Sequence, residues 1–324
     1  MTKDLKELIK YTKNIGTDIH FIQAGGGNTS IKKDGKLYIK ASGSIFRNFS
    51  KKNIAVLNLS NGEQIFPEDF SSNNPSMESS FHSVIKSKFV SHLHCLRTIL
   101  ISSLGMLNYL EKQLLNEELT IDLIDYVTPG DELGKRISLL NLDNRSGIIL
   151  LQNHGIIIYG DTIQEIYSYQ KIVEAVSKKI LNDLNIKFGD GLLSEVNSNM
   201  DKIKIFRLHN ISLDQIKFLS DSYFFPDQII YLNNKINWNI FKDINSLLNE
   251  SLDNEIYFLE SEEIVFTNYN DEVFEIIWAL LFIISGITQS NNIKDIRLLH
   301  PNEKNRLLNM PEEIHRKNVS DHRL

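Results

Sequence analysis

The sequence predicts an α/β protein, because segments of helical periodicity and short strand-like segments alternate along the chain. The helical segments carry apolar residues three or four positions apart. The strand-like segments either alternate apolar with polar residues or form brief apolar runs. The 324 residues, 42% of them hydrophobic, suffice for one large domain or two ordinary ones with a substantial core.

Each element is predicted from such a local pattern. The expected helices cover residues 3–15, a segment beginning near 76, a segment beginning near 97, and residues 132–140, 162–184 and 272–284. The expected strands cover residues 37–40, 54–59, 89–95, 147–151, 156–159, 228–232 and 256–259, with another around Ile31 and an irregular stretch before Tyr126. Asp34-Gly35 predicts a hairpin turn, and Ser76 and Asp161 are the expected N-caps of the helices that follow them.

Composition and charge exclude several classes of protein. The formal net charge is −6, which argues against a protein that binds nucleic acid through its phosphates. A single cysteine, Cys95, excludes an internal disulfide framework and favours a reducing compartment. The N-terminus lacks the apolar core of a signal peptide, and the most apolar run, residues 276–287, is shorter than the ~20 residues that span a bilayer. We therefore expect a soluble, cytoplasmic protein with no membrane segment.

A lapse in periodicity at residues 187–191 indicates a domain boundary. Residues 1–190 form the first expected domain. Residues 191–324 form a smaller α+β region, with strand-like pieces and one apolar core helix, to which the sequence assigns no role.

Three histidines are candidate metal ligands. His92 and His94 are two positions apart on a predicted strand, so their side chains leave the same face, while Cys95 points to the opposite face and into the core. The alternative interpretation is that these two histidines are ordinary polar residues of a strand. His154 ends an apolar strand and precedes a glycine, which adds a third imidazole at a strand end. Three imidazoles with an open fourth position are typical of a catalytic zinc site.

Glu78 is a candidate acid–base residue. It lies in the first turn of the helix that precedes the His92 strand, so the two side chains can converge. Its carboxylate is a fourth metal ligand, a general base, or an ordinary first-turn residue favoured by the helix dipole. His82, one turn later, either orients that carboxylate or belongs to a packed face.

A glycine-rich segment, residues 25–30, is a candidate site for a phosphate or carboxylate. Its glycines, up to Gly27, offer backbone amides without obstructing side chains, and the polar residues after them add hydrogen-bonding groups. A structural turn is the alternative, and no Walker lysine follows. The further polar groups that can complete the concavity are Asn28, Thr29, Ser30, Ser42, Gly43, Ser44 and Ser76.

The ordered set of these motifs resembles the class II aldolase and adducin family over roughly residues 1–190. The motifs are Asn28-Thr29-Ser30, Ser42-Gly43, Pro75-Ser76-x-Glu78-x-x-x-His82, His92-x-His94, Tyr126-x-x-Pro129-Gly130 and Asn153-His154-Gly155. Each motif is common alone, whereas their order and spacing together are specific. Residues 225–231, Phe-Pro-Asp-Gln-Ile-Ile-Tyr, also resemble the additional region of longer members.

The resemblance implies an α/β/α sandwich around a central, mainly antiparallel sheet. It implies that zinc or a similar divalent cation is held by His92, His94 and His154, with Glu78 as the acid–base residue and sometimes a further ligand. It places the anionic end of a substrate against Asn28, Thr29, Ser42, Gly43 and Ser76. In family aldolases a tyrosine, often from a neighbouring subunit, protonates the leaving aldehyde. The candidates are Tyr109 and Tyr126, although Tyr126 also fits a structural turn, and a homo-oligomer, with a tetramer favoured, is the expected assembly.

The leading hypothesis is a metal-dependent lyase that cleaves or forms a carbon–carbon bond next to the carbonyl of a ketose, sugar phosphate or sugar acid. The cation stabilises an enediolate as a Lewis acid, and Glu78 transfers the proton at carbon. No lysine is placed as an evident Schiff base. Three alternatives stay open: an epimerase or dehydratase with a similar site, a non-catalytic adducin-like binding protein, and a zinc hydrolase.

Overall fold

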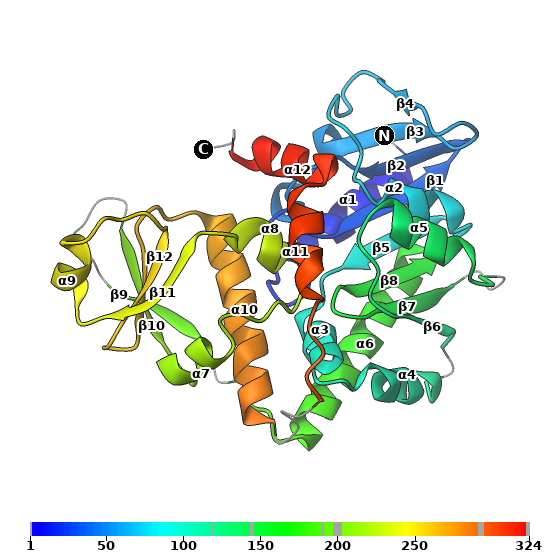
Figure 1. Cartoon of the computed structure of the whole chain (residues 1–324). Coiled ribbons are helices and arrows are strands. Elements are labelled where there is room, and N and C mark those ends of the chain that lie inside the picture. The colour runs from blue at the N-terminus through cyan, green and yellow to red at the C-terminus, as the bar shows by residue number, and fades with distance from the viewer. Residues whose placement is uncertain are drawn as a thin grey trace.

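The computed structural model describes residues 2–117, 119–142, 146–188, 191–196, 203–290 and 295–321. These residues form two β-sheets, one of eight strands and one of five, each the centre of a lobe (Figure 1). Gly189 and Asp190, at the predicted domain boundary, lie outside the described residues.

The larger sheet is mainly antiparallel, as the resemblance implies. Its strands are β1 (Asn28–Lys33), β2 (Lys36–Lys40), β3 (Ile54–Asn58), β4 (Gln64–Ile65), β5 (Phe89–Leu93), β6 (Ile121–Ile124), β7 (Gly147–Leu151) and β8 (Gly155–Gly160). They lie in the order β4-β3-β2-β1-β5-β8-β7-β6. Every neighbouring pair is antiparallel except β6 and β7.

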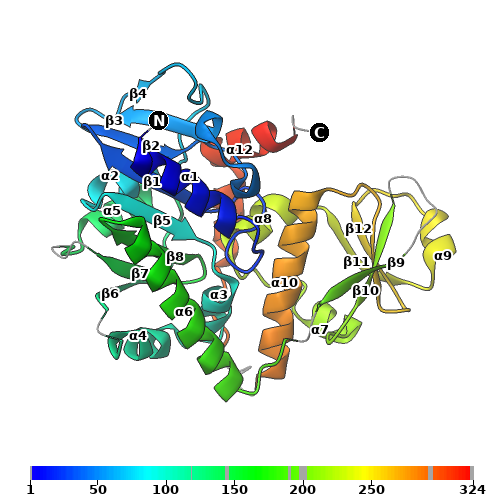
Figure 2. The same ribbon diagram turned by 180° about the vertical axis from the view of Figure 1, so that it is seen from behind.

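Helices cover both faces of this sheet, which confirms the α/β/α sandwich. They are α1 (Lys3–Ile15), α2 (Ser79–Val84), α3 (Leu96–Ser103), α4 (Leu107–Leu115), α5 (Asp131–Ser138) and α6 (Ile163–Asp183), with short 3₁₀ helices η1 (Phe46–Asn48) and η2 (Lys51–Asn53). One face packs against α2 and α5, where Phe81 and Leu133 meet Ile149 and Ile157. The other face packs against α1, α3 and α6, and Figure 2 shows α1 and α6 lying across it.

The C-terminal part of the chain contains the smaller sheet and six helices among the described residues. Its strands are β9 (Leu193–Val196), β10 (Lys204–Leu208), β11 (Ile236–Phe241), β12 (Ile256–Leu259) and β13 (Glu263–Phe266), in the order β11-β12-β13-β10-β9. The helices are α7 (Leu213–Phe218), α8 (Pro226–Leu232), α9 (Ile244–Leu248), α10 (Asp271–Gln289), α11 (Pro301–Leu308) and α12 (Pro311–Asp321). The apolar helix α10 lies between the lobes and contacts α3, α7 and α8 (Figures 1 and 2). Helices α11 and α12 contact α8 and bring the end of the chain back to the larger lobe.

Most predicted elements are confirmed, including the helix over residues 3–15 and the apolar core helix. The Asp34-Gly35 turn is also confirmed, with φ values of 51° and 70° that suit a tight hairpin. The prediction of a strand over residues 228–232 is wrong, because these residues form α8. Pro226 provides the fixed φ of a first helical turn, and all seven residues of α8 are buried, including the polar Asp227 and Gln228, so no exposed polar face marks the helical period. The stretch before Tyr126, predicted as irregular, contains α4 and β6.

Two predicted N-caps are also wrong. Thr162, not Asp161, caps α6, because its hydroxyl accepts from the Glu165 amide while the Glu165 carboxylate accepts from the Thr162 amide. Asp161 accepts from the Lys88 amide instead. Helix α2 begins at Ser79, which puts Glu78 rather than Ser76 at the N-cap position.

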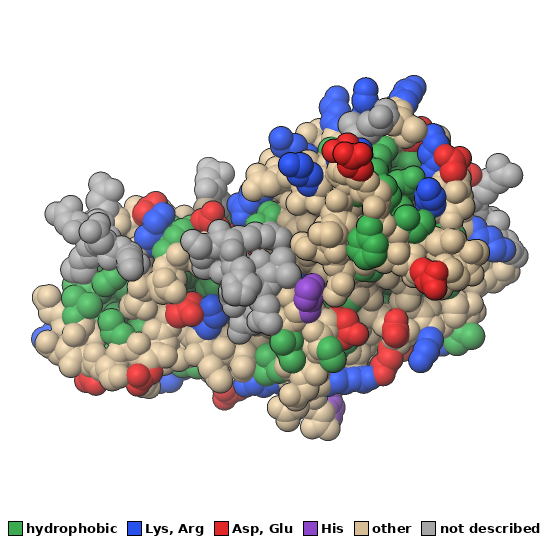
Figure 3. All heavy atoms as spheres, turned by 90° about the horizontal axis from the view of Figure 1, so that it is seen from above, with side chains coloured by type: hydrophobic (Ala, Val, Ile, Leu, Met, Phe, Trp, Pro, Cys, Tyr) green, Lys and Arg blue, Asp and Glu red, His purple; other side chains and the backbone are tan. Residues whose placement is uncertain are grey.

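The surface carries charges of both signs. Seen from above, lysine and arginine side chains are interspersed with aspartate and glutamate over both lobes (Figure 3). Across the described residues, no helix combines the length and the hydropathy needed to cross a bilayer.

Candidate metal centre

Three histidines meet at one end of strands β5 and β8. His92 lies in β5, paired with neighbours on β1 and β8, and His94 comes one residue after β5 ends. His154 lies in the turn between β7 and β8. That turn needs Gly155, whose φ is +132° and whose Cβ, if present, would overlap the carbonyl oxygen of Leu93. This close approach holds His154 beside the end of β5.

The three imidazole rings surround a common point. The ring centroid of His92 is 4.9 Å from that of His94 and 4.7 Å from that of His154, and the other two are 5.1 Å apart. One ring nitrogen of each residue lies within 4.8 Å of the others. All three side chains are buried. Such a set of nitrogen atoms can hold a divalent cation.

Burial keeps two of these imidazoles neutral. It lowers the pKa of His92 to about 4, against the opposing effect of the Glu78 carboxylate. Burial, reinforced by the neighbouring histidines, lowers the pKa of His154 well below its ordinary value. Neutral imidazole is the form that ligates a metal, so the electrostatics of the cluster suit a ligand set.

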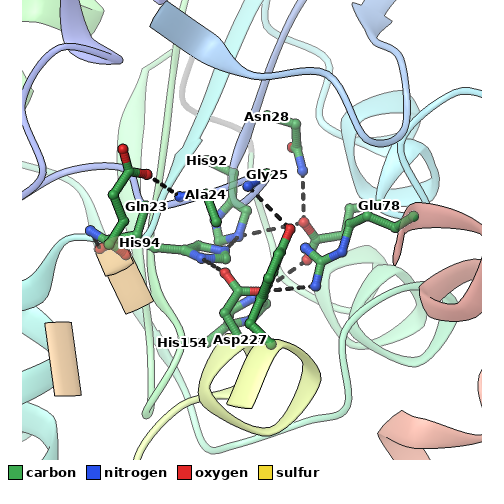
Figure 4. A network of polar contacts seen from close by, with 12 residues as sticks. Gln23, Ala24, Gly25, Asn28, Glu78, His92, His94, His154 and Asp227 are labelled. Atoms are coloured by element: carbon green, nitrogen blue, oxygen red, sulfur yellow. Dashed lines mark hydrogen bonds and ion pairs between the residues drawn. The ribbon is translucent and has the colours of Figure 1, made fainter. Parts of the chain in front are cut away.

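Hydrogen bonds orient two of the rings. Nδ1 of His92 donates to the carbonyl oxygen of Ile156 at 3.0 Å. Nδ1 of His94 donates to Oδ2 of Asp227 at 2.7 Å (Figure 4). Each donation leaves the Nε2 lone pair available, and the two Nε2 atoms are 3.1 Å apart. Both rings therefore present Nε2 to the centre of the cluster.

Glu78 lies directly against the histidines. Its Oε2 is 3.5 Å from Nε2 of His92, and its Oε1 is 3.7 Å from Nε2 of His154. The residue is only 5% exposed. The N-cap position in front of α2 thus brings Glu78 to the cluster, as the sequence predicts.

A chain of polar side chains orients Glu78. Asn28 donates from Nδ2 to Oε2 of Glu78 at 2.7 Å. His82 donates from Nε2 to Oδ1 of Asn28, and its Nδ1 accepts from the Ser30 hydroxyl at 2.7 Å. Of the two interpretations of His82, the structure favours orientation of the carboxylate, acting through Asn28 rather than by direct contact.

The donor set fits a divalent cation. Three imidazole nitrogens and one carboxylate oxygen are the ligands that zinc accepts. Oε1 of Glu78 is buried and has no hydrogen-bond partner among the described residues. Buried polar atoms rarely lack a partner, and a cation among the histidines would give this oxygen one.

A cavity of about 30 Å³ opens beside the cluster. His94, His154 and Glu78 line it. Most of the predicted substrate-binding residues line it too, namely Gly27, Asn28, Ser42, Gly43 and Ser76. The structure thus brings residues from five separate sequence motifs to one concavity.

Three predicted site residues lie elsewhere. Thr29 points to the opposite face of β1 from Asn28, and its hydroxyl is 2.7 Å from that of Thr12 in α1, because successive strand residues alternate faces. Tyr109 lies on the surface of α4 and is 45% exposed. The Tyr126 hydroxyl donates to Glu303 of α11 at 3.0 Å. Within one chain, none of these three side chains lines the cavity, and neither do Ser30 and Ser44, the other two polar candidates.

The glycine-rich loop is already bound to the rest of the protein. The amide of Ala24 donates to Glu275 of α10 at 2.6 Å, and that of Gly25 donates to the Tyr231 hydroxyl of α8 at 3.2 Å. The amide of Gly26 donates within the loop. These three amides therefore hold a structural turn in place, and of the polar residues at positions 28–30 only Asn28 lines the cavity.

Four charged residues also line the cavity that the sequence did not identify as site residues: Lys40, Asp227, Glu313 and Arg316. Burial raises the pKa of Asp227, but Arg316 and His94 outweigh burial and hold this pKa below its ordinary value. Burial raises the pKa of Glu313 to about 7. Asp227 lies in the 225–231 motif, which was a usable signal. Nothing local to α12 indicates that Glu313 and Arg316 reach this site.

A larger groove of about 640 Å³ lies between α1 and α6. Tyr11, Tyr167 and Lys178 are among the described residues that line it, and none of those residues is a histidine. Converging chemical groups rather than size identify a candidate active site, so the small cavity is the candidate.

Acid is expected to destabilise the metal-free protein. Burial lowers the pKa of His20, His82, His92 and His154 below the ordinary value of 6.5. Unfolding therefore takes up protons below pH 6.5, and each net proton lowers the free energy of unfolding by about 1.4 kcal/mol per pH unit. Glu313 opposes this trend, because its raised pKa makes the folded protein bind a proton between pH 4.5 and pH 7.

Burial also raises the pKa of Glu275 and Asp122, but the four histidines still outnumber these three carboxylates, so stability should fall as the pH is lowered from 6.5 toward 4. Urea unfolding of chelator-treated protein at several pH values measures how the free energy of unfolding changes with pH. A free energy of unfolding that stays level or rises over this interval would contradict the neutral, buried state of the histidines.

The sheet topology and the histidine–glutamate cluster together define a protein of the class II aldolase type. A model of the N-terminal domain of class II aldolases and adducins matches residues 6–181, and the chain belongs to this family. It is 30% identical over 191 residues to the L-fuculose phosphate aldolase of Methanococcus vannielii, a match that covers 57% of this chain and 98% of the relative. Its identity to the L-fuculose phosphate aldolase of Methanocaldococcus jannaschii is 26%, covering 57% and 99% of the two chains.

Among solved structures, the N-terminal class II aldolase domain of a conserved Thermoplasma acidophilum protein is 21% identical. It has a TM-score of 0.47 and covers 56% of this chain and 95% of that one. The family match ends at residue 181, so the smaller sheet and helices α7 to α12 lie beyond it.

Proposed function

We propose that the protein is a metal-dependent lyase of the aldolase type that acts on a ketose, sugar phosphate or sugar acid. The observation that carries this proposal is the meeting of three buried histidines with Glu78 at one cavity. The names of the two relatives, both L-fuculose phosphate aldolases that match along almost their whole length, support the same class of reaction.

The metal site consists of His92, His94 and His154. Zinc or a similar cation held there supplies a Lewis acid that polarises a carbonyl group. The histidine side chains contribute neutral nitrogen donors, and their burial keeps bulk water from competing.

Glu78 moves the proton at the carbon next to the carbonyl. Its Oε2 is held by Asn28, whereas its Oε1 has no hydrogen-bond partner among the described residues. We infer that Oε1 contacts the cation when no substrate is bound and exchanges the proton when the substrate is present. General acid–base catalysis needs such an oriented group within hydrogen-bond reach of the substrate.

The anionic end of the substrate lies against the polar side of the cavity. Asn28, Ser42 and Ser76 offer hydrogen-bonding side chains there, Gly43 allows close approach of its backbone, and Lys40 adds positive charge. Thr29 is not among these ligands, because its hydroxyl is bonded on the other face of β1.

Substrate entry requires the cavity to widen. The cavity measures about 30 Å³, room for little more than a water molecule. Pockets that hold small-molecule ligands measure roughly 300–1,000 Å³. Because Glu313 and Arg316 of α12 line the cavity, movement of this helix or of these two side chains makes room for a sugar.

Residues 1–190 form the catalytic domain in this proposal, in a cytoplasmic protein that assembles into a homo-oligomer, with a tetramer favoured. The tyrosine that protonates the leaving aldehyde comes from a neighbouring copy. Tyr109 is the better candidate, because it lies on the surface of α4, whereas the Tyr126 hydroxyl is engaged by Glu303.

Product analysis tests the reaction. We expect the zinc-loaded protein to split L-fuculose 1-phosphate, or another ketose 1-phosphate, between C3 and C4 into two carbonyl compounds, detected by mass spectrometry. An epimer or a dehydrated product would instead show the epimerase or dehydratase alternative. Full metal content with no conversion across a panel of ketose phosphates and sugar acids would contradict the lyase and favour an adducin-like binding role.

A further inference from the structure

The C-terminal part of the chain reaches the metal centre through α8 and α12. Asp227, in the first turn of α8, is 1% exposed, and its Oδ2 is 2.7 Å from Nδ1 of His94. Its other oxygen, Oδ1, accepts from Nη2 of Arg316 in α12 at 2.7 Å. Figure 4 shows Asp227 beside His94 and His154, on the side of the cluster opposite Asn28.

Each oxygen of the Asp227 carboxylate accepts a hydrogen bond from a different donor, one from His94 and the other from Arg316. The hydrogen bond from His94 decides which ring nitrogen carries the proton, and so directs Nε2 to the cluster. The backbone of Gly26 packs closely against this hydrogen bond. A Cβ at Gly26 would lie 2.6 Å from both Oδ2 of Asp227 and Nδ1 of His94. The hydrogen bond to Asp227 therefore fixes the ring of His94 at Nδ1, while its Nε2 faces the other two histidines.

Arg316 holds Asp227 in turn. Its side chain is 12% exposed, its Nε lies 2.7 Å from Oε2 of Glu313, and its guanidinium carbon lies 5.5 Å from the ring centre of Tyr231. A buried carboxylate needs a compensating charge, and the planar guanidinium supplies one with a fixed direction. Helix α12 is thus connected to the metal centre through a continuous chain, Arg316–Asp227–His94.

We propose that Asp227 is a positioning residue for the metal ligand His94 and that Arg316, from α12, positions Asp227. The C-terminal region then completes the metal centre of the first domain instead of being a separate appendage. This inference rests on the proposed function, because it requires that His94 binds a metal. It concerns residues that lie beyond the part of the chain matched by the family model.

The test measures metal affinity directly, without activity. Zinc affinity is determined by competition with a chromophoric chelator, and cobalt(II) absorption reports the geometry of the ligands. We expect Asp227→Asn to weaken zinc binding about 10- to 100-fold, as for other outer partners of metal-bound histidine, and to alter the cobalt spectrum. Asparagine has one acceptor oxygen, so His94 and Arg316 cannot both be satisfied. Arg316→Gln should weaken binding less, and Arg316→Lys should restore part of the loss.

Glu174→Gln is the matched control. The Glu174 side chain is 15% exposed and also pairs with an arginine, Arg97, at 2.6 Å, but its ion pairs are with Arg97 and Lys178 and not with the three histidines of the cluster. This variant should melt at a lower temperature yet keep the zinc affinity and the cobalt spectrum of the unaltered protein. A role of Asp227 in folding alone would give the same pattern for Asp227→Asn.

A double variant covers the case in which Asp227→Asn does not fold. Asp227→Asn with Arg316→Gln leaves no unpaired charge between these two positions and is expected to fold, with zinc binding still weakened. Unaltered zinc affinity and cobalt spectrum in a folded Asp227 variant would overturn the inference while leaving the proposed function in place. Absence of metal binding by the unaltered chain would overturn both.

Discussion

Replacing His92 or His154 with alanine should abolish stoichiometric zinc binding. Each residue supplies one of three nitrogen donors that lie within 4.8 Å of one another, and no other described histidine is close enough to replace it. Loss of an outer partner of a metal ligand already costs about 10- to 100-fold in affinity, so loss of a direct ligand should cost at least as much. Elemental analysis after gel filtration measures the metal content.

His209→Ala is the control for this pair of variants. His209 lies just after β10 in the smaller lobe, and its Nε2 is 2.7 Å from the Ser194 hydroxyl, so its removal should leave one zinc per chain. Circular dichroism shows whether each variant is folded. Full zinc content in folded His92→Ala and His154→Ala protein would refute the metal centre, and with it the proposed reaction.

Replacing Glu78 with glutamine should separate metal binding from proton transfer. Glutamine has the same size and can still accept the hydrogen bond from Asn28, but it cannot take up a proton. We expect the metal to stay bound, while exchange of the substrate's α-proton with solvent deuterium slows roughly 100- to 10,000-fold, the usual contribution of an acid–base residue.

Nuclear magnetic resonance of the substrate in D₂O follows this exchange. Glu250→Gln, an exposed carboxylate after α9, serves as the control and should exchange at the rate of the unaltered protein. Exchange at an unchanged rate in zinc-loaded Glu78→Gln would remove Glu78 as the base. Loss of the metal in that variant would instead show that the carboxylate is chiefly a ligand.

The parts of the site that the sequence predicts correctly depend on local geometry. His92 and His94 could be paired because strand residues two apart share a face, and the relation held although β5 ends at Leu93. The same alternation sends Thr29 to the far face from Asn28, which a motif that names both residues does not reveal. Helix α8 escaped prediction because every residue in it is buried, so its apolar run does not distinguish a helix from a strand.

The sequence alone determined that this chain carries three histidines and a glutamate at the spacing of a metal site in a layered α/β fold. Strand alternation, turn chemistry and the order of short motifs are properties of neighbouring residues, so they can be read along the chain. Only the tertiary structure decided that Asp227 lies behind His94, 133 positions away, and that Arg316 of the last helix reaches both Asp227 and the cavity. Such contacts depend on how the two lobes pack against each other. Packing between segments that are distant in the sequence produces no periodic pattern of residues from which it could be predicted.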